Sequence, residues 1–242
     1  MKARRVVLAL ALALAMVLVA TPGWAGMGIG GYVTGSFGGS DIEEEWQNGF
    51  ENVDYDPDTS ALGGGFVLDT NLNGTQLFNY RLYAGYERAV VERENITVTD
   101  STGTQTLAMP VDYEFDRYLT DHCFGFALIS DDMLRVWAGP MVRLSYETYE
   151  DVTRHYTGGG YMDERNDIQA WGFGGGGIVG INVHITPTMS VCGDAGYRVT
   201  GYWGENERAM AGTATNASIT EYDYTDVESS FFGNVSFMVS FN

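Results

Sequence analysis

The last twelve residues, Phe231–Asn242, read "FFGNVSFMVSFN". One parity holds Phe231, Gly233, Val235, Phe237, Val239 and Phe241, and the other holds Phe232, Asn234, Ser236, Met238 and Ser240. A period of two with one apolar and one mostly polar side predicts a sided β-strand. Chain ends usually fray, so a strand that continues to the end indicates that it completes a sheet.

The same period recurs upstream and predicts eight strands. They are Gly28–Gly38, Ser60–Asp69, a strand from Leu77, its return over 104–129, Met133–Thr148, Ala170–Ile185, Met189–Trp203 and Val227–Phe241. Connections after the second, fourth and sixth strands are short, and the others, such as 39–59, are long or extend a hairpin. This asymmetry is typical of transmembrane β-barrels. The apolar parity changes within 104–129, which predicts a β-bulge between Asp116 and Cys123.

The N-terminus has the layout of a secretory signal. Lys2, Arg4 and Arg5 precede the apolar run Val6–Ala20, and small residues lead to Ala25. We expect cleavage after Ala25, giving a signal peptide at 1–25 and one barrel domain at 26–242. An N-terminal anchor is the alternative, although the run is shorter than the roughly 20 residues of a spanning helix.

The chain is strongly acidic, with a net charge of −19 that becomes about −22 without the signal. This charge argues against nucleic acid as a partner and against binding to an anionic membrane surface through basic residues. No Cys/His cluster supports a zinc site, and we expect no cofactor. Cys123 and Cys192 are expected to point inward on opposite walls, too far apart for a disulfide, and to remain free thiols.

The polar face of the predicted strands carries a set of charged residues that a membrane barrel would enclose. The set is Arg81, Glu87, Arg135, Arg143, Glu147, Asp194 and Arg198. Alternation alone cannot distinguish a soluble barrel from a membrane barrel, but aromatics gather near both strand ends, as at two lipid–water interfaces. Because an eight-stranded barrel is only wide enough for its own side chains, we expect a salt-bridged plug rather than an ion path.

In these features the chain resembles the small outer-membrane β-barrels of Gram-negative bacteria, of the OmpA transmembrane-domain and OmpX/Ail type. The run 177–198, "GIVGINVHITPTMSVCGDAGYR", resembles their strand–turn–strand hairpins. The resemblance implies an outer-membrane location in contact with lipid and lipopolysaccharide. It also implies recognition of the terminal phenylalanine by the barrel-insertion machinery; here Asn242 follows Phe241, a small departure. We expect no peptidoglycan-binding domain after the barrel, unlike in full OmpA proteins.

Two further patterns bear on metal binding and catalysis. Asp54, Asp56 and Asp58 have the D-x-D-x-D spacing of a calcium loop, but Thr59 and Gly65 occupy the positions of its glycine and bidentate glutamate. They are weak metal candidates in an acidic, solvated segment. 

The histidines that could belong to a Ser–His–acid site are His122, His155 and His184. His122 adjoins Asp121, and His184 has no serine one or two positions away. We expect no catalytic residues and no enzyme.

The leading hypothesis is therefore an outer-membrane β-barrel with a structural or surface-interaction role through its long extracellular loops, with no identified partner. A narrow passive channel for small solutes is the first alternative. A soluble exported lipocalin-like barrel, with its apolar face inside, is the second.

Overall fold

The structure is a computed structural model that describes residues 26–46, 51–72, 76–100, 103–157, 160–212 and 218–241. The predicted signal peptide, 1–25, lies outside these residues. The strands are β1 (Met27–Trp46), β2 (Glu51–Tyr55), β3 (Asp58–Asp69), β4 (Phe78–Asp100), β5 (Gly103–Ser130), β6 (Leu134–Thr157), β7 (Gly160–Thr186), β8 (Met189–Gly212) and β9 (Ser218–Phe241). The described residues include no helix long and apolar enough to cross a membrane.

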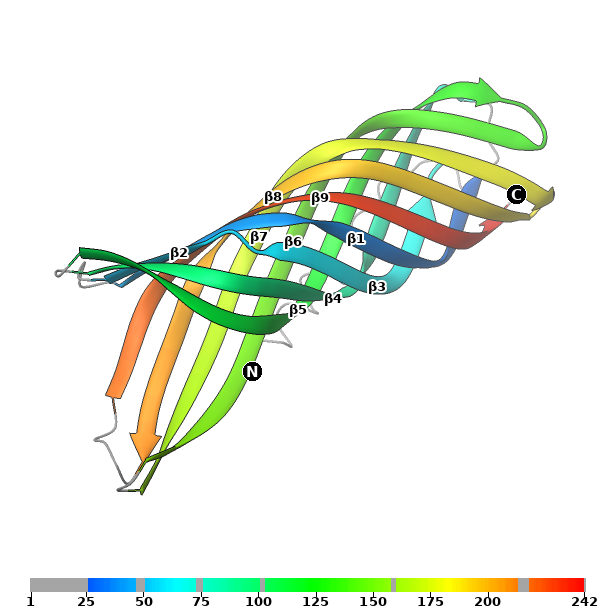
Figure 1. The fold of residues 1–242 in the computed structure, drawn as a ribbon. Coiled ribbons are helices and arrows are strands. Elements are labelled where there is room, and N and C mark those ends of the chain that lie inside the picture. Colours follow the sequence, from blue (N-terminus) through cyan, green and yellow to red (C-terminus); the bar gives the residue numbers. More distant parts are fainter. Residues whose placement is uncertain are drawn as a thin grey trace.

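The strands form one antiparallel up-and-down barrel that closes between β9 and β1 (Figure 1). The closing pair runs from Met27↔Phe241 to Trp46↔Tyr222. The predicted role of the terminal strand is therefore confirmed. If the paired residues are traced from Ile29 through every strand of the barrel, the trace returns to β1 at Gly39. The strands are therefore staggered by ten residues around the barrel. Such a stagger accompanies strands tilted by about 35–45° from the barrel axis.

β2 and β3 occupy a single position in the barrel. Both pair with β1 on one side and β4 on the other, and Asp56 and Pro57 interrupt them. The nine segments thus fill eight strand positions, the predicted number.

The long connections are mostly continuations of the strands. Most of 39–59, for example, belongs to β1, β2 and the start of β3. β5 and β6 pair only from Asp116↔Thr148 toward the short turns. Beyond that point β5 and β6 are edges in the described chain, and their hairpins diverge (Figure 1). Pro110 on β5 suits an edge because proline cannot donate a ladder hydrogen bond.

The bulge predicted between Asp116 and Cys123 is wrong. Pairing of β5 with β4 is continuous there, and the irregularities lie opposite Arg93–Asn95 and between Ala127 and Ile129. The parity changed because Phe115 points into the barrel, where the projecting end has an apolar interior. 

The barrel is apolar outside, and its interior contains all the buried charged residues together with apolar side chains. On β9, Val235, Phe237 and Val239 are exposed, whereas Asn234 and Ser236 are buried. This arrangement is the reverse of a water-soluble barrel, so the lipocalin-like alternative is wrong.

Candidate functional site

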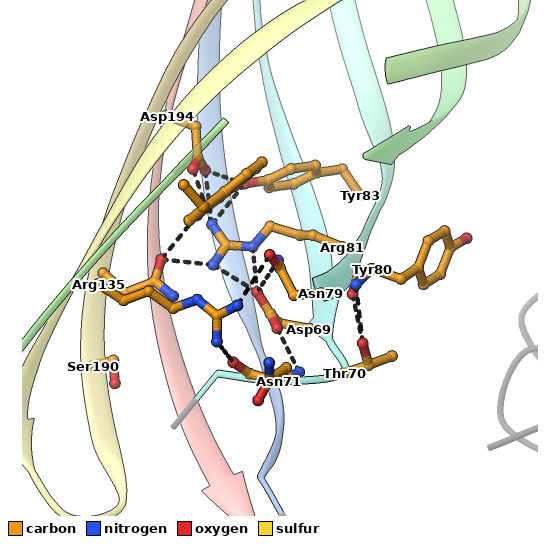
Figure 2. Close-up of polar contacts among 12 residues, drawn as sticks. Asp69, Thr70, Asn71, Asn79, Tyr80, Arg81, Tyr83, Arg135, Ser190 and Asp194 are labelled. Carbon is orange, nitrogen blue, oxygen red and sulfur yellow. Dashed lines mark hydrogen bonds and ion pairs between the residues drawn. The ribbon is translucent and has the colours of Figure 1, made fainter. Parts of the chain in front are cut away.

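Arg81 on β4 organises the charged layer nearest the short turns (Figure 2). Its Nε donates to Asp69 Oδ2 at 2.8 Å, and Nη1 donates to both Asp194 oxygens at 2.9 and 3.1 Å. Nη2 donates to Asn182 Oδ1 at 2.7 Å, and the guanidinium carbon lies 4.9 Å from the centroid of the Trp137 ring. All five side chains are buried, so one guanidinium links five strands and pairs with two carboxylates.

The turn between β3 and β4 folds under this layer and covers it. The Asn71 side-chain amide donates to the carbonyl oxygens of Gln76 and Phe78 at 3.0 and 2.9 Å. Arg135 on β6 donates to the carbonyl oxygens of Asn71 and Gln76 at 2.8 and 3.0 Å (Figure 2). Leu72, fully buried, packs into the interior. The short-turn end is thereby filled by protein.

Arg143 on β6 organises a second layer. It donates to both oxygens of Glu87 on β4 at 3.1 Å, and to both oxygens of Asp121 on β5 at 2.7 and 2.8 Å. Arg198 on β8 places Nη2 3.6 Å from Glu87 and donates to the Ser36 hydroxyl at 3.2 Å. Paired, charge-assisted bonds of this kind are strong and directional, so they hold opposite walls in fixed register.

Arg117 on β5 organises a third layer, beyond the second. Its Nε donates to Glu147 Oε2 at 2.8 Å, and its Nη1 pairs with Glu228 on β9. The guanidinium carbon lies 4.9 Å from the centroid of the Tyr202 ring. Arg117, Glu147 and Glu228 are buried, so their ion pairs lie inside the barrel and link its strands.

Apolar side chains fill the space between and beyond the charged layers. The inner apolar cluster is Tyr32, Val67, Leu72, Tyr83, Cys123, Trp137, Met141, Ile178, Cys192, Phe232 and Met238. The outer apolar cluster is Ile42, Tyr55, Ala89, Val91, Phe115, Ile168, Ala170, Tyr202 and Tyr224. Cys123 and Cys192 are free buried thiols in the inner cluster. The described interior is therefore a packed core.

The structure places all seven residues predicted for the interior network inside the barrel. The sequence reasoning missed Asp69, Arg117, Asp121, Asp226 and Glu228, which are also buried there. Arg117 and Asp121 were missed because a bulge was expected at their positions. In a continuous strand they share the parity of Cys123 and therefore point inward. Asp226 and Glu228 share the parity of Asn234, a signal that could have found them.

The histidines occupy separate places. His122 faces outward, with its Nδ1 2.6 Å from the Tyr80 hydroxyl and its Nε2 3.3 Å from the Thr120 hydroxyl. His184 does have a serine partner, because the β7–β8 register brings the Ser190 hydroxyl to 2.8 Å from its Nδ1. Ser190 is fully buried, so its hydroxyl does not reach solvent. The side chain of His155 is outside the described residues.

The weak metal candidates lie along an extended segment. Asp54 is on β2, Asp56 lies in the interruption and Asp58 begins β3, and all three are exposed. Alternate residues of an extended strand lie about 6.6 Å apart, whereas a calcium loop curls its ligands around one ion. Among the described residues no three His, Cys, Asp or Glu side chains are grouped to hold a metal.

At the short-turn end of the barrel, opposite the projecting hairpins, the Asp131 carboxylate caps the tight turn between β5 and β6. The backbone N–H groups of Met133 and Leu134 donate to Asp131 at 2.9 and 2.8 Å. Because these bonds favour the ionised form, they lower the pKa of the Asp131 carboxyl.

The outer wall carries a continuous aromatic row. Successive strand partners from β4 to β8 are Tyr86, Tyr118, Tyr146, Trp171 and Trp203. Tyr86 and Tyr118 approach to 5.6 Å between centroids, and Tyr146 and Trp171 to 4.9 Å. 

Other aromatic pairs mark both limits of the apolar belt. Phe37 and Phe231 stack at 5.8 Å near the projecting end, and Phe78 and Phe126 meet at 5.6 Å near the short turns. Exposed apolar side chains with aromatic borders suit lipid between two aqueous interfaces. The fold is that of an outer-membrane β-barrel.

Similarity to known proteins is limited to solved structures at low identity. No protein-family model matches the sequence, and no curated protein matches it. The Escherichia coli outer membrane protease OmpT aligns at 10% identity over 92% of this chain and 99% of its own, with a TM-score of 0.45. The Pseudomonas aeruginosa outer membrane protein OprG aligns at 13% identity over 90% and 97%, with a TM-score of 0.46.

Neisserial surface protein A aligns at 12% identity over 87% of this chain and 97% of its own, with a TM-score of 0.29. These barrels comprise a protease, an outer membrane protein and a surface protein. At such low identities and TM-scores, the assignment of the fold rests on this chain's own strand pairing and lipid-suited wall.

Proposed function

We propose that this outer-membrane barrel is a closed, non-enzymatic anchor that presents an acidic extracellular surface to basic partners. The observation that carries the proposal is the interior: three layers of buried charges, most of them in ion pairs, alternate with apolar clusters. Such packing favours an anchor over the narrow channel, whose solutes would have to displace these ion pairs.

Charge supplies the expected chemistry of the partner. The hairpin segments 40–59, 88–116, 149–168 and 204–226 contain 24 Asp and Glu residues against five arginines, and the chain has no lysine after Lys2. A surface of this sign attracts basic proteins and repels acidic ones. We propose contacts with outer-membrane lipid and lipopolysaccharide along the belt, and assembly by the barrel-insertion machinery through the terminal strand.

The first test is conductance. Purified protein in planar bilayers should give currents close to background, because the described interior holds side chains throughout its length. Stable single-channel steps would overturn the closed-anchor proposal in favour of the passive channel.

The second test uses polylysine as a cationic probe on protein in neutral-lipid vesicles. Binding should weaken as salt rises, because the Debye length falls from about 10 Å at 0.1 M to about 3 Å at 1 M. The variant Glu43→Gln/Glu45→Gln/Asp54→Asn removes three exposed hairpin charges and should lower the affinity. Asp132→Asn, in the short turn at the other end, is the control. Equal binding by all three proteins would refute an acidic docking surface.

A further inference from the structure

The second and third charged layers contain more buried acids than bases. Their carboxylates are Glu87, Asp121, Glu147, Asp226 and Glu228, and their guanidiniums are Arg117, Arg143 and Arg198, each at most 5% exposed. The first layer, by contrast, balances Asp69 and Asp194 with Arg81 and Arg135. The uncompensated negative charge therefore belongs to the projecting half of the barrel.

Ion pairing locates this excess around Arg117. Arg143 and Arg198 are engaged with Glu87, and Arg143 also with Asp121. Arg117 is left to face three carboxylates, and it pairs with two of them, Glu147 and Glu228.

Asp226 forms no ion pair among the described residues. Its Oδ2 accepts a hydrogen bond of 3.5 Å from the Ser40 hydroxyl, and its side chain is fully buried. A second oxygen in the same layer, Glu147 Oε1, is buried without a hydrogen-bond partner in the described structure, as is Asp226 Oδ1. A buried, uncompensated carboxylate is costly in free energy, and proteins usually avoid it by neutralising the group.

The titratable and charged groups around Asp226 and Glu147 come from all sides of the barrel. They are Arg117 (β5), Arg143 (β6), Tyr202 and Arg198 (β8), and Tyr224 and Glu228 (β9), with the Ser40 hydroxyl from β1. The strand β7 contributes the apolar Ile168 and Ala170 to this region. The three arginines are the cations of this set, and they leave the excess uncompensated.

We propose that Asp226 and Glu147 hold at least one proton between them at neutral pH, so that the stability of the projecting half of the barrel is linked to proton binding. A proton removes one negative charge and supplies a donor to the partnerless carboxylate oxygens. A metal ion is the less suitable ligand, because no three acidic, His or Cys side chains of the described chain are grouped for coordination.

The electrostatic environment of Asp226 supports this assignment. The residue pairs with Tyr202, next to the Trp203–Thr225 pair, so it lies at the projecting-side border of the aromatic row, beyond the eleven residues Phe231–Phe241. Burial, followed by the nearby Glu147 carboxylate, raises the pKa of the Asp226 carboxyl well above its usual range. An unfolded chain releases this proton near pH 4. Stability should therefore fall as pH rises from about 4 toward the raised pKa of the folded protein.

The test combines infrared spectroscopy with thermal unfolding of protein in vesicles. At pH 7 the parent should show the C=O stretch of a protonated carboxylic acid, and Asp226→Asn should lose or shift that band. Raising the pH from 6 to 9.5 should lower the parent melting temperature by roughly 3 °C or more, and should change that of Asp226→Asn by less than half as much. Glu147→Gln should also reduce the dependence of the melting temperature on pH.

Asp163→Asn is the matched control, because Asp163 is a partly exposed hairpin carboxylate paired with Arg154; its profile should follow the parent. If a variant does not insert, the parent spectrum and melting profile decide the matter. Absence of the acid band with a flat profile would overturn the proposal. The proposal would also be overturned if the parent protein lacked the acid band and its melting temperature dropped when a chelator was added. That result would assign the charge compensation to a metal ion.

Discussion

At the scale of single residues, arginine organises the interior. Arg81, Arg117, Arg143 and Arg198 each engage at least one carboxylate from another strand. A guanidinium offers five donors in a rigid plane and stays charged, whereas lysine presents a point charge that burial readily deprotonates. Planar geometry lets one side chain bridge several strands, which explains how five inward arginines can cross-link the barrel.

Replacing Arg81 with methionine should destabilise the barrel by about 3–5 kcal/mol, because Asp69 and Asp194 are left buried without their cation. Urea unfolding in lipid vesicles, followed by tryptophan fluorescence, measures this change. Arg165→Met is the matched control: its guanidinium is half exposed and pairs with Glu150 at 2.9 Å, so about 1 kcal/mol or less is expected.

A rescue variant completes this design. Arg81→Met combined with Asp69→Asn and Asp194→Asn should recover part of the lost stability, because the unpaired charges are then absent. Equal stability of Arg81→Met and Arg165→Met would show that the buried layer contributes no more than a surface pair.

At the scale of elements, each strand has two faces with different size limits. On β7, inward glycines make room for large side chains from the neighbouring strands β6 and β8. A Cβ at Gly180 would lie 2.2 Å from Asp194 Oδ1 and 2.3 Å from Cε2 of Trp137. Gly177, on the outward face of the same strand, has nothing within 4 Å of such a Cβ. The small size of glycine is therefore required by interior packing at Gly180, whereas Gly177 has free space beside it on the lipid face.

Gly180→Ala should cost about 1–3 kcal/mol through overpacking against Trp137 and Asp194. Gly177→Ala, the same substitution three residues away, should change stability by less than about 0.5 kcal/mol. The difference in urea midpoint between the two variants measures the tightness of the interior. Equal midpoints would contradict a filled barrel at this level.

At the scale of the whole molecule, the barrel is turned inside out relative to a soluble protein. Trp171 and Trp203 are 60% and 55% exposed in the apolar belt, whereas Trp137 is fully buried. Large rings tolerate the lipid–water interface because they combine an apolar body with a polar group.

Single-tryptophan variants should report this arrangement. With the other tryptophans replaced by phenylalanine, brominated lipids should strongly quench Trp171 and Trp203, because these rings contact the acyl chains or their headgroup boundary. Trp137 should be quenched weakly, since the barrel wall separates it from lipid. Comparable quenching of all three would contradict the assignment of inner and outer faces.

The sequence by itself determined the eight strand positions, the alternation of short and long connections and the closure by Phe231–Phe241. These features depend on local period and turn spacing, which each segment carries alone. The inward position of Arg81 or Asp194 followed from the same period.

Only the tertiary structure decided which charges meet. Arg81 and Asp194 are 113 residues apart in the chain, and Arg117 reaches Glu228 across 111 residues; such pairs depend on barrel stagger, which no single strand encodes. The structure also removed the expected bulge, because Phe115 enters an apolar layer beyond the charged ones. Alternation identifies two faces of a strand, but only closure of the sheet decides which face is enclosed and which meets lipid.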